Sequence, residues 1–153
     1  MKIFPIGYIH LRAERRNIRK IDFHQLIDGY SNMFRILVCG DREYTKTSPI
    51  YEILDKFRSD HSSIHIIHGG CRGVDTTAGK YAIEHKLECW SLGKRAGPIR
   101  NIQMLNEGTP DIVLAFHDNI KNSKGTKNML ITSKKKGVKT ILFNSKGVII
   151  PFN

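Results

Sequence analysis

From residue 34 onward, short apolar runs alternate with longer segments of helical periodicity. Five of these runs are predicted as strands, at 34–39, 64–68, 88–92, 112–116 and 140–143. Strands that alternate with helical segments are typical of βαβ units, in which neighbouring strands run parallel. The pattern therefore predicts an α/β fold: a Rossmann-like open sheet of about five parallel strands in the order 3-2-1-4-5, with helices on both faces.

The segments between the predicted strands carry helix signals. Helices are predicted at 49–57, at 74–85, from Pro98 onward and from near Thr126 to Lys136. The first has apolar residues at i, i+3, i+4 and i+7, with Ser48 as the predicted N-cap. The last ends in lysines at 134–136 followed by Gly137, where cations complement the helix dipole and glycine can adopt a left-handed conformation. The helix dipole therefore explains the lysine run, and no functional role is needed for it.

Length and composition predict one globular domain over 33–153, preceded by a basic extension over 1–32. We interpret the extension as a solvated appendage, or as sequence upstream of a start at Met33, rather than as a nucleic-acid arm. The chain has no apolar run of the roughly 18 to 20 residues that a membrane span needs, and its first residues do not form a signal peptide, so we expect a cytoplasmic protein. Its three cysteines include no Cys-x-x-Cys pair, which indicates neither a disulfide framework nor a metal site.

The formal net charge of +11 is the strongest compositional signal. Residues 1–32 contribute +3, from six basic and three acidic residues, and residues 33–153 contribute +8, from 19 and 11. We interpret the charge as spread along the chain. A surplus of this size attracts polyanions and anionic small molecules alike.

The loop after the second predicted strand has the sequence HGGCRG at 68–73. In a parallel sheet ligands bind beyond the carboxyl ends of the strands, and glycines there allow the backbone N–H groups to approach a phosphate. Tight packing of a helix against a strand also requires glycine, so this loop alone leaves both interpretations open.

Three further loops strengthen the phosphate interpretation. Arg100 follows Gly97 in the first turn of a predicted helix, where the dipole disfavours a cation and a bound anion would remove the conflict. Ser123, Lys124, Gly125 and Thr126 also place hydroxyl groups, a cation and a glycine at the start of the last helix, and Gly40, Asp41 and Arg42 follow the first predicted strand. The candidate binding residues of the four loops are Gly40, Arg42, His68, Gly69, Gly70, Arg72, Gly73, Gly97, Arg100, Asn101, Lys124, Gly125 and Thr126.

The ordered motifs resemble a known family. VCGDR at 38–42, HGGCRGVD at 68–75, AGPIRNIQM at 96–104 and KGT at 124–126 together are similar to the YspA-type (cpYpsA-related) branch of the SLOG superfamily, over about residues 33–144. That superfamily is Rossmann-like and includes cytokinin-activating phosphoribohydrolases, the DNA-processing protein DprA and domains proposed to sense nucleotide-derived ligands. The resemblance implies a nucleotide-type ligand at these loops.

Two positions depart from the phosphoribohydrolases. Those enzymes carry a glutamate three residues after the threonine of their Gly-Thr pair, where this chain has Met129. The segment at 93–96 is also short, which removes part of the usual pocket wall. Cys71 stands where the resembling proteins commonly have alanine, so we interpret it as a small residue rather than a nucleophile.

Three functions follow, in this order of preference. The first is binding or sensing of a nucleotide derivative, such as ADP-ribose, an NAD derivative or a nucleoside monophosphate, without turnover. The second is N-glycosidic hydrolysis by a phosphoribohydrolase-type enzyme, with Asp75 and then Asp41 as candidate catalytic carboxylates; Asp75 has the alternative role of complementing a helix dipole. The third is a DprA-like nucleic-acid module, in which basic residues between 12 and 20 would add phosphate contacts. The sequence indicates no cofactor and leaves the formation of a homo-oligomer open.

Overall fold

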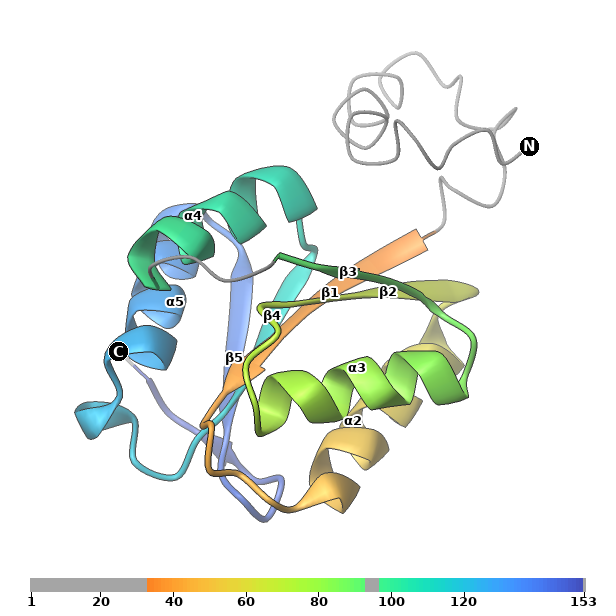
Figure 1. Cartoon of the computed structure of the whole chain (residues 1–153), viewed down its shortest axis with the longest axis horizontal. Coiled ribbons are helices and arrows are strands. Elements are labelled where there is room, and N and C mark those ends of the chain that lie inside the picture. The colour runs from red at the N-terminus through yellow and green to blue at the C-terminus, as the bar shows by residue number, and fades with distance from the viewer. Residues whose placement is uncertain (1–32, 93–96, 153) are drawn as a thin grey trace.

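The computed structural model describes residues 33–92 and 97–152, which build one mixed sheet covered by helices on both faces (Figure 1). The sheet order is β3-β2-β1-β4-β5-β6. The strands are β1 (Met33–Gly40), β2 (Ser63–His68), β3 (Glu88–Ser91), β4 (Ile112–Phe116), β5 (Lys139–Phe143) and β6 (Ile149–Ile150). The helices are α2 (Thr47–Asp60), α3 (Val74–Glu84), α4 (Gly97–Gly108), the 3-10 helix η4 (Ile120–Asn122) and α5 (Lys124–Lys135).

The first five strands are parallel and confirm the predicted order 3-2-1-4-5. The prediction missed β6, which pairs antiparallel with β5 at the edge of the sheet. Its two residues are too few to show the alternation that identifies a strand in sequence. A turn closed by the Asn144 side chain, which accepts hydrogen bonds from the N–H groups of Lys146 and Val148, brings the chain back to β5.

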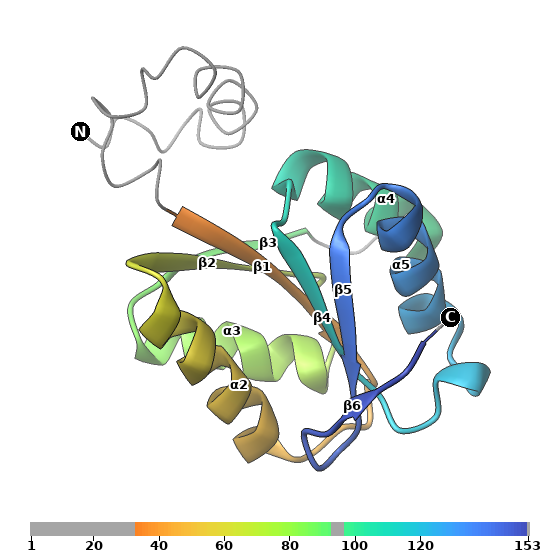
Figure 2. The ribbon, with the colours of Figure 1, turned by 180° about the vertical axis from the view of Figure 1, so that it is seen from behind.

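The central strands are buried on both faces because helices cover each side of the sheet, as Figure 2 shows for α2 and α3 on one face and α4 and α5 on the other. All five residues of β4 are buried. Since successive strand side chains point to opposite faces, Ile36 and Leu37 of β1 enter different hydrophobic cores. This two-sided burial explains why β1, β2 and β4 are mostly apolar along their whole length.

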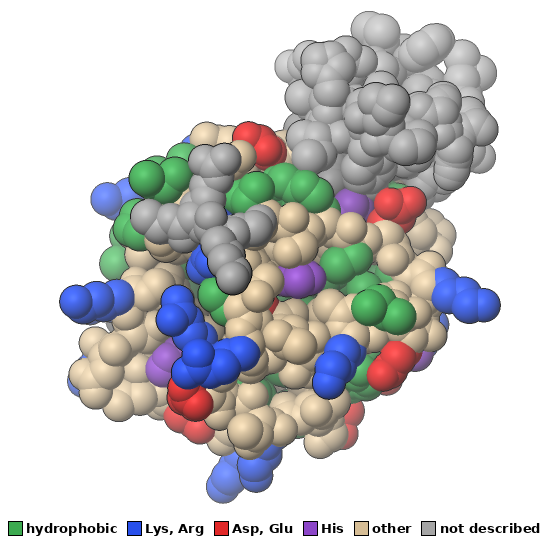
Figure 3. Space-filling view, in the orientation of Figure 1, with side chains coloured by type: hydrophobic (Ala, Val, Ile, Leu, Met, Phe, Trp, Pro, Cys, Tyr) green, Lys and Arg blue, Asp and Glu red, His purple; other side chains and the backbone are tan. Residues whose placement is uncertain are grey.

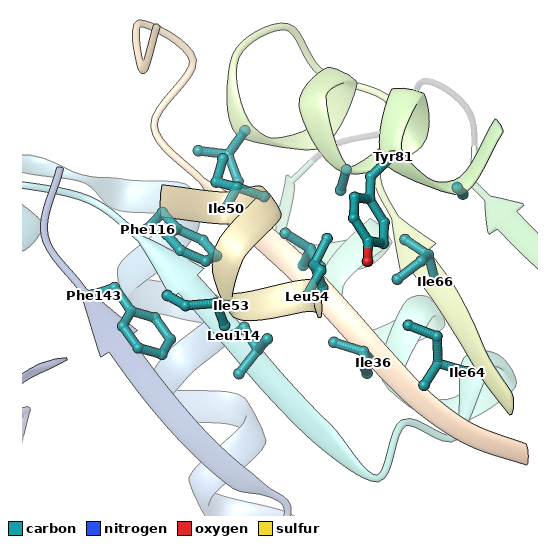
Figure 4. Close-up of a cluster of buried hydrophobic side chains, with 14 of the residues drawn as sticks. Ile36, Ile50, Ile53, Leu54, Ile64, Ile66, Tyr81, Leu114, Phe116 and Phe143 are labelled. Carbon is teal, nitrogen blue, oxygen red and sulfur yellow. The ribbon is translucent and has the colours of Figure 1, made fainter. Parts of the chain in front are cut away.

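The core under α2 and α3 contains Ile50 and Leu54 of α2 and Tyr81 of α3, all fully buried (Figure 4). The Tyr81 hydroxyl donates a hydrogen bond to Asp55 Oδ1 at 2.5 Å and accepts one from Arg58 Nε at 3.1 Å, which joins the two helices. The opposite core is built by α4 and α5 against the other face of the sheet. It contains Leu37, Met104, Leu105, Met129, Leu130 and Leu142.

Two predicted helix starts need correction. Helix α2 begins at Thr47, so Ser48 already lies in its first turn, and the N-cap position is Lys46, whose side chain makes no capping bond. Helix α5 begins at Lys124, two residues before the predicted start, because Ser123 caps it: Ser123 Oγ accepts the N–H of Thr126 at 3.2 Å. Gly137 follows α5 with φ +76°, as its predicted role requires.

The predicted extension over 1–32 and the loop at 93–96 lie outside the described residues. Of the helices that the structure describes, none has both the length and the apolar character needed to cross a membrane.

The backbone at Gly40, at the end of β1, leaves no room for a side chain. A Cβ there would lie 2.3 Å from the carbonyl oxygen of Phe116 and 2.7 Å from Val74 Cγ2, whereas a Cβ at Gly97 would meet nothing within 4 Å. Gly40→Ala is therefore expected to lower the free energy of unfolding by about 2–4 kcal/mol, and Gly97→Ala to leave it unchanged or raise it by less than about 1 kcal/mol. Urea denaturation of both variants measures this; equal stabilities would contradict the packing shown by the structure.

Candidate functional site

A pocket of about 470 Å³ lies beyond the carboxyl ends of β1 and β4, where the sheet order reverses. Lys and Arg side chains gather on this part of the surface, with acidic side chains directly beside them (Figure 3, left of centre). The predicted site residues that line the pocket are Gly40, Asp41, Arg42, Arg72, Asp75, Arg100, Asn101, Lys124, Gly125 and Thr126. Five other predicted binding residues are absent from its lining: His68, Gly69, Gly70, Gly73 and Gly97.

The glycine loop between β2 and α3 is closed by hydrogen bonds within the chain. Asp75 Oδ2 accepts the N–H groups of Gly69 at 3.0 Å and Cys71 at 3.2 Å. His68 Nδ1 accepts the N–H of Gly70 at 3.0 Å, and burial lowers the pKa of this histidine, which favours the neutral ring that an acceptor nitrogen requires. Three N–H groups of the loop that was predicted to hold a phosphate, those of Gly69, Gly70 and Cys71, are thus already bonded to internal acceptors.

Two glycines of the predicted phosphate loops serve close packing. Gly73 has φ +80°, and a Cβ there would lie 2.3 Å from the carbonyl oxygen of Asp41. The N–H of Val74 donates to that same oxygen at 3.3 Å, so the loops after β1 and β2 are held backbone to backbone. For Gly73, as for Gly40, the alternative that the sequence left open, tight packing, accounts for the glycine.

Asp75 is only 5% exposed, although it carries a carboxyl group. Burial raises its pKa from 3.8 to about 6, while the N–H groups of Cys71 and Gly69 and the charges of Arg100 and Arg42 act in the opposite direction. The side chain therefore combines a structural role in the loop with a titration close to neutral pH.

Arg100 is the lining cation that has a buried hydrogen-bond donor without an acceptor among the described residues. It lies in the first turn of α4, and its Nη1 donates to Cys71 Sγ at 3.3 Å. Its Nε is buried and has no hydrogen-bond partner among the described residues. The guanidinium packs on the backbone of Gly69, where a Cβ would lie 3.0 Å from Nε. A buried donor without an acceptor is destabilising, and an anionic ligand in the pocket would supply the missing acceptor.

The start of α5 is positioned by Asn101, which is 4% exposed. Its Nδ2 donates to the carbonyl oxygen of Gly125 at 3.1 Å and to Asn128 Oδ1 at 3.0 Å, which ties α4 to α5. Asn101 thus fixes the position of the first turn of α5, which includes the lining residue Thr126, at the edge of the pocket.

Charges around the pocket nearly cancel. Arg42, Arg72, Arg100 and Lys124 face Asp41, Glu43 and Asp75, so four positive and three negative groups leave +1. Arg72 forms an ion pair with Glu43 at the exposed rim, a contact worth at most about 1 kcal/mol. The attraction for an anion therefore comes from the placement of individual cations and helix ends rather than from a large net charge.

Several lining residues were not predicted to lie in the site: Cys39, Glu43, Met104, His117 and Ser123. Cys39 and Met104 form an apolar floor together with Met129, and burial raises the pKa of the Cys39 thiol so that it stays protonated. Of the missed residues, Ser123 carried a readable signal, because a serine that precedes a helix is a common N-cap. Within the described residues, no group of three or more His, Cys, Asp or Glu side chains could hold a metal ion.

The parallel sheet, its helices and a pocket at the switch point define a Rossmann-like α/β domain. Within this class, residues 34–92 match the model of the YspA, cpYpsA-related SLOG family, which confirms the resemblance to that branch over the motifs at 38–42 and 68–75. The matched segment runs from β1 to β3 and includes the glycine loop.

The chain is also similar to the Gene 61 protein of Mycobacterium phage D29, at 29% identity over 127 residues, which is 74% of this chain and 99% of the relative. Among solved structures, Acinetobacter baumannii MurG has a TM-score of 0.49 at 5% identity over 72% of this chain. E. coli tRNA N6-threonylcarbamoyladenosine dehydratase, TcdA, solved in complex with AMP, has a TM-score of 0.48 at 12% identity over 86% of this chain. The chain spans 35% and 56% of these two longer chains.

The raised pKa of Asp75 predicts a pH-dependent stability. The folded protein binds the proton more tightly than the unfolded chain does, so ionisation of Asp75 lowers stability as the pH rises from about 4 to about 6. Asp75→Asn retains an oxygen acceptor and removes the charge. Its free energy of unfolding is expected to increase relative to wild type by up to about 3 kcal/mol between pH 4 and pH 7.

Urea denaturation at several pH values measures this difference. Asp60→Asn, which changes an exposed carboxyl group at the end of α2, is the control and should follow the wild-type pH profile. A constant difference between Asp75→Asn and wild type at every pH would contradict the prediction.

Proposed function

We propose that the pocket binds a small phosphate-bearing ligand, a nucleotide or a nucleotide derivative. The observation that carries this proposal is the buried Arg100 Nε, which has no partner among the described residues and lies where the first turns of α3, α4 and α5 line one pocket. Helix N-termini and an arginine together are a common arrangement for phosphate. The match to the SLOG family supports the same ligand class.

We assign the phosphate to the side of the pocket formed by Arg100 and the start of α5, where Lys124 adds a charge and Thr126 a hydroxyl group. On this proposal the glycine loop shapes the pocket through Asp75 and Arg100 instead of cradling the phosphate with its own N–H groups. The pocket volume of about 470 Å³ is within the range of small-molecule sites, and the floor of Cys39, Met104 and Met129 offers an apolar surface to a base or ribose.

Of the two candidate functions of the pocket, we prefer binding of the ligand without its hydrolysis. Met129, at the position of the phosphoribohydrolase glutamate, is 1% exposed and belongs to the core under α4 and α5. Asp75 Oδ2 is occupied by two backbone N–H groups. N-glycosidic hydrolysis is the second candidate, and the observation that favours it is the raised pKa of Asp75, since a carboxyl group that titrates near neutral pH suits proton transfer.

Arg100→Ala should weaken binding of the preferred ligand about 10- to 100-fold, because the variant loses a charge-assisted hydrogen bond inside the pocket. Calorimetry with nucleoside monophosphates, ADP-ribose and NAD measures the affinities. Lys80→Ala, which removes an exposed cation of α3, is the matched control and should bind as wild type does. Absence of saturable binding across the panel, or equal affinity of Arg100→Ala and wild type, would refute the proposal.

The same ligands test for hydrolysis. Chromatography after overnight incubation should show intact nucleotide with wild-type protein. Release of free base that Asp75→Asn abolishes would establish the hydrolase instead, with Asp75 as its catalytic group.

A further inference from the structure

The positive charge of the domain is concentrated in its last 35 residues. Residues 33–118 contain 11 basic and 11 acidic residues and are formally neutral, whereas residues 119–153 contain eight lysines and no acidic residue. The interpretation that the charge is spread along the chain is therefore wrong within the domain. All of its +8 comes from η4, α5, β5 and the segments that join or follow them.

Four of these lysines project from the solvent side of α5. At 100° per residue, Lys124, Lys127, Lys134 and Lys135 fall within an arc of roughly 100° opposite the buried residues of the helix. All four are exposed, as are the other lysines of residues 119–153. We call this cationic stripe the α5 face; its first lysine, Lys124, also lines the pocket. Helix α5 itself packs on the outside of the sheet (Figures 1 and 2).

The helix dipole explains only part of the α5 face. It favours Lys134 and Lys135 in the last turn, but it disfavours Lys124 and Lys127 at the opposite end, where the first turn contains no acidic residue. No ion pair between the α5 face and a carboxylate occurs within the described residues. Soluble proteins normally intersperse charges of both signs, so a single-sign face with cations at both ends of one helix calls for an external anion.

We propose that the α5 face binds the phosphate backbone of nucleic acid. From Lys124 to Lys135 the helix rises about 16 Å, which equals the axial rise of about five base pairs of a duplex. The α5 face is a straight row of charges on a rigid element, which fits a regular polyanion. An anionic membrane is less well matched, because the apolar side of α5 is buried in the core and Ile131 is the only large hydrophobic residue of α5 that is more than a third exposed.

The test uses the full chain and fluorescently labelled 20-nucleotide DNA, single-stranded and duplex, with fluorescence anisotropy from 50 to 200 mM salt. Lys127→Glu combined with Lys135→Glu reverses two charges of the α5 face and leaves the pocket lining unchanged. We expect at least a tenfold loss of affinity at 100 mM salt and a fall of about 1 to 2 in the slope of log affinity against log salt. Mononucleotide binding should be unaffected.

Lys56→Glu combined with Lys80→Glu is the matched control, because it makes the same change of net charge at exposed lysines of α2 and α3. It should retain oligonucleotide binding within about threefold of wild type. The proposal is overturned if wild type does not bind DNA at 50 mM salt, if both double variants lose affinity equally, or if vesicles containing phosphatidylserine bind and DNA does not. Arg100→Ala should bind DNA as wild type does, so failure of the pocket proposal and failure of this one remain distinguishable.

Discussion

The carboxylate of Asp75 is the group on which the geometry of the pocket depends. By accepting the N–H groups of Gly69 and Cys71, it fixes the path of the chain between β2 and α3. That path leaves a flat backbone surface at Gly69 on which the Arg100 guanidinium packs. Burial of the carboxylate is unfavourable by itself and is only partly offset by these two hydrogen bonds and by the neighbouring arginines, so its pKa stays raised. The buried Asp75 carboxylate thus links the glycine loop, the start of α3 and the Arg100 side chain.

The same group of side chains keeps the net charge of the pocket small. Glu43 engages Arg72 at the rim, and Asp75 balances part of the charge inside, so Arg100 is left as the cation with an unused buried donor. The α5 face, in contrast, carries many exposed cations and no acids. In our proposals, a single oriented donor in the pocket favours recognition of one small ligand, whereas a row of exposed lysines favours a long polyanion with little discrimination.

The fold could be predicted largely from the sequence because burial on both faces of β1, β2 and β4 leaves mostly apolar runs, and a glycine at the end of β1 and after β2 marks two of the loops. The edge strand β6 could not, since two residues show no period. At the site, Asp75, Arg100 and Thr126 each follow a predicted strand, and this position was enough to predict that all three lie at the same edge of the sheet. Spacing does not reveal which acceptor a loop N–H will find, so the closure of the glycine loop by Asp75 and His68, and the pairing of Arg72 with Glu43, required the structure.

Because the loops after β1 and β2 are in backbone contact, the two sides of the pocket differ in how readily they accept a larger side chain. A new side chain has no room at Gly40, which lines the pocket, or at Gly73, which lies outside its lining, so this side of the pocket admits almost no variation at these positions. Gly125, on the α5 side, has open space around the position of an added Cβ. A related protein, or an engineer, could therefore reshape the cavity for a different guest by placing side chains at the start of α5 while leaving the rigid wall untouched.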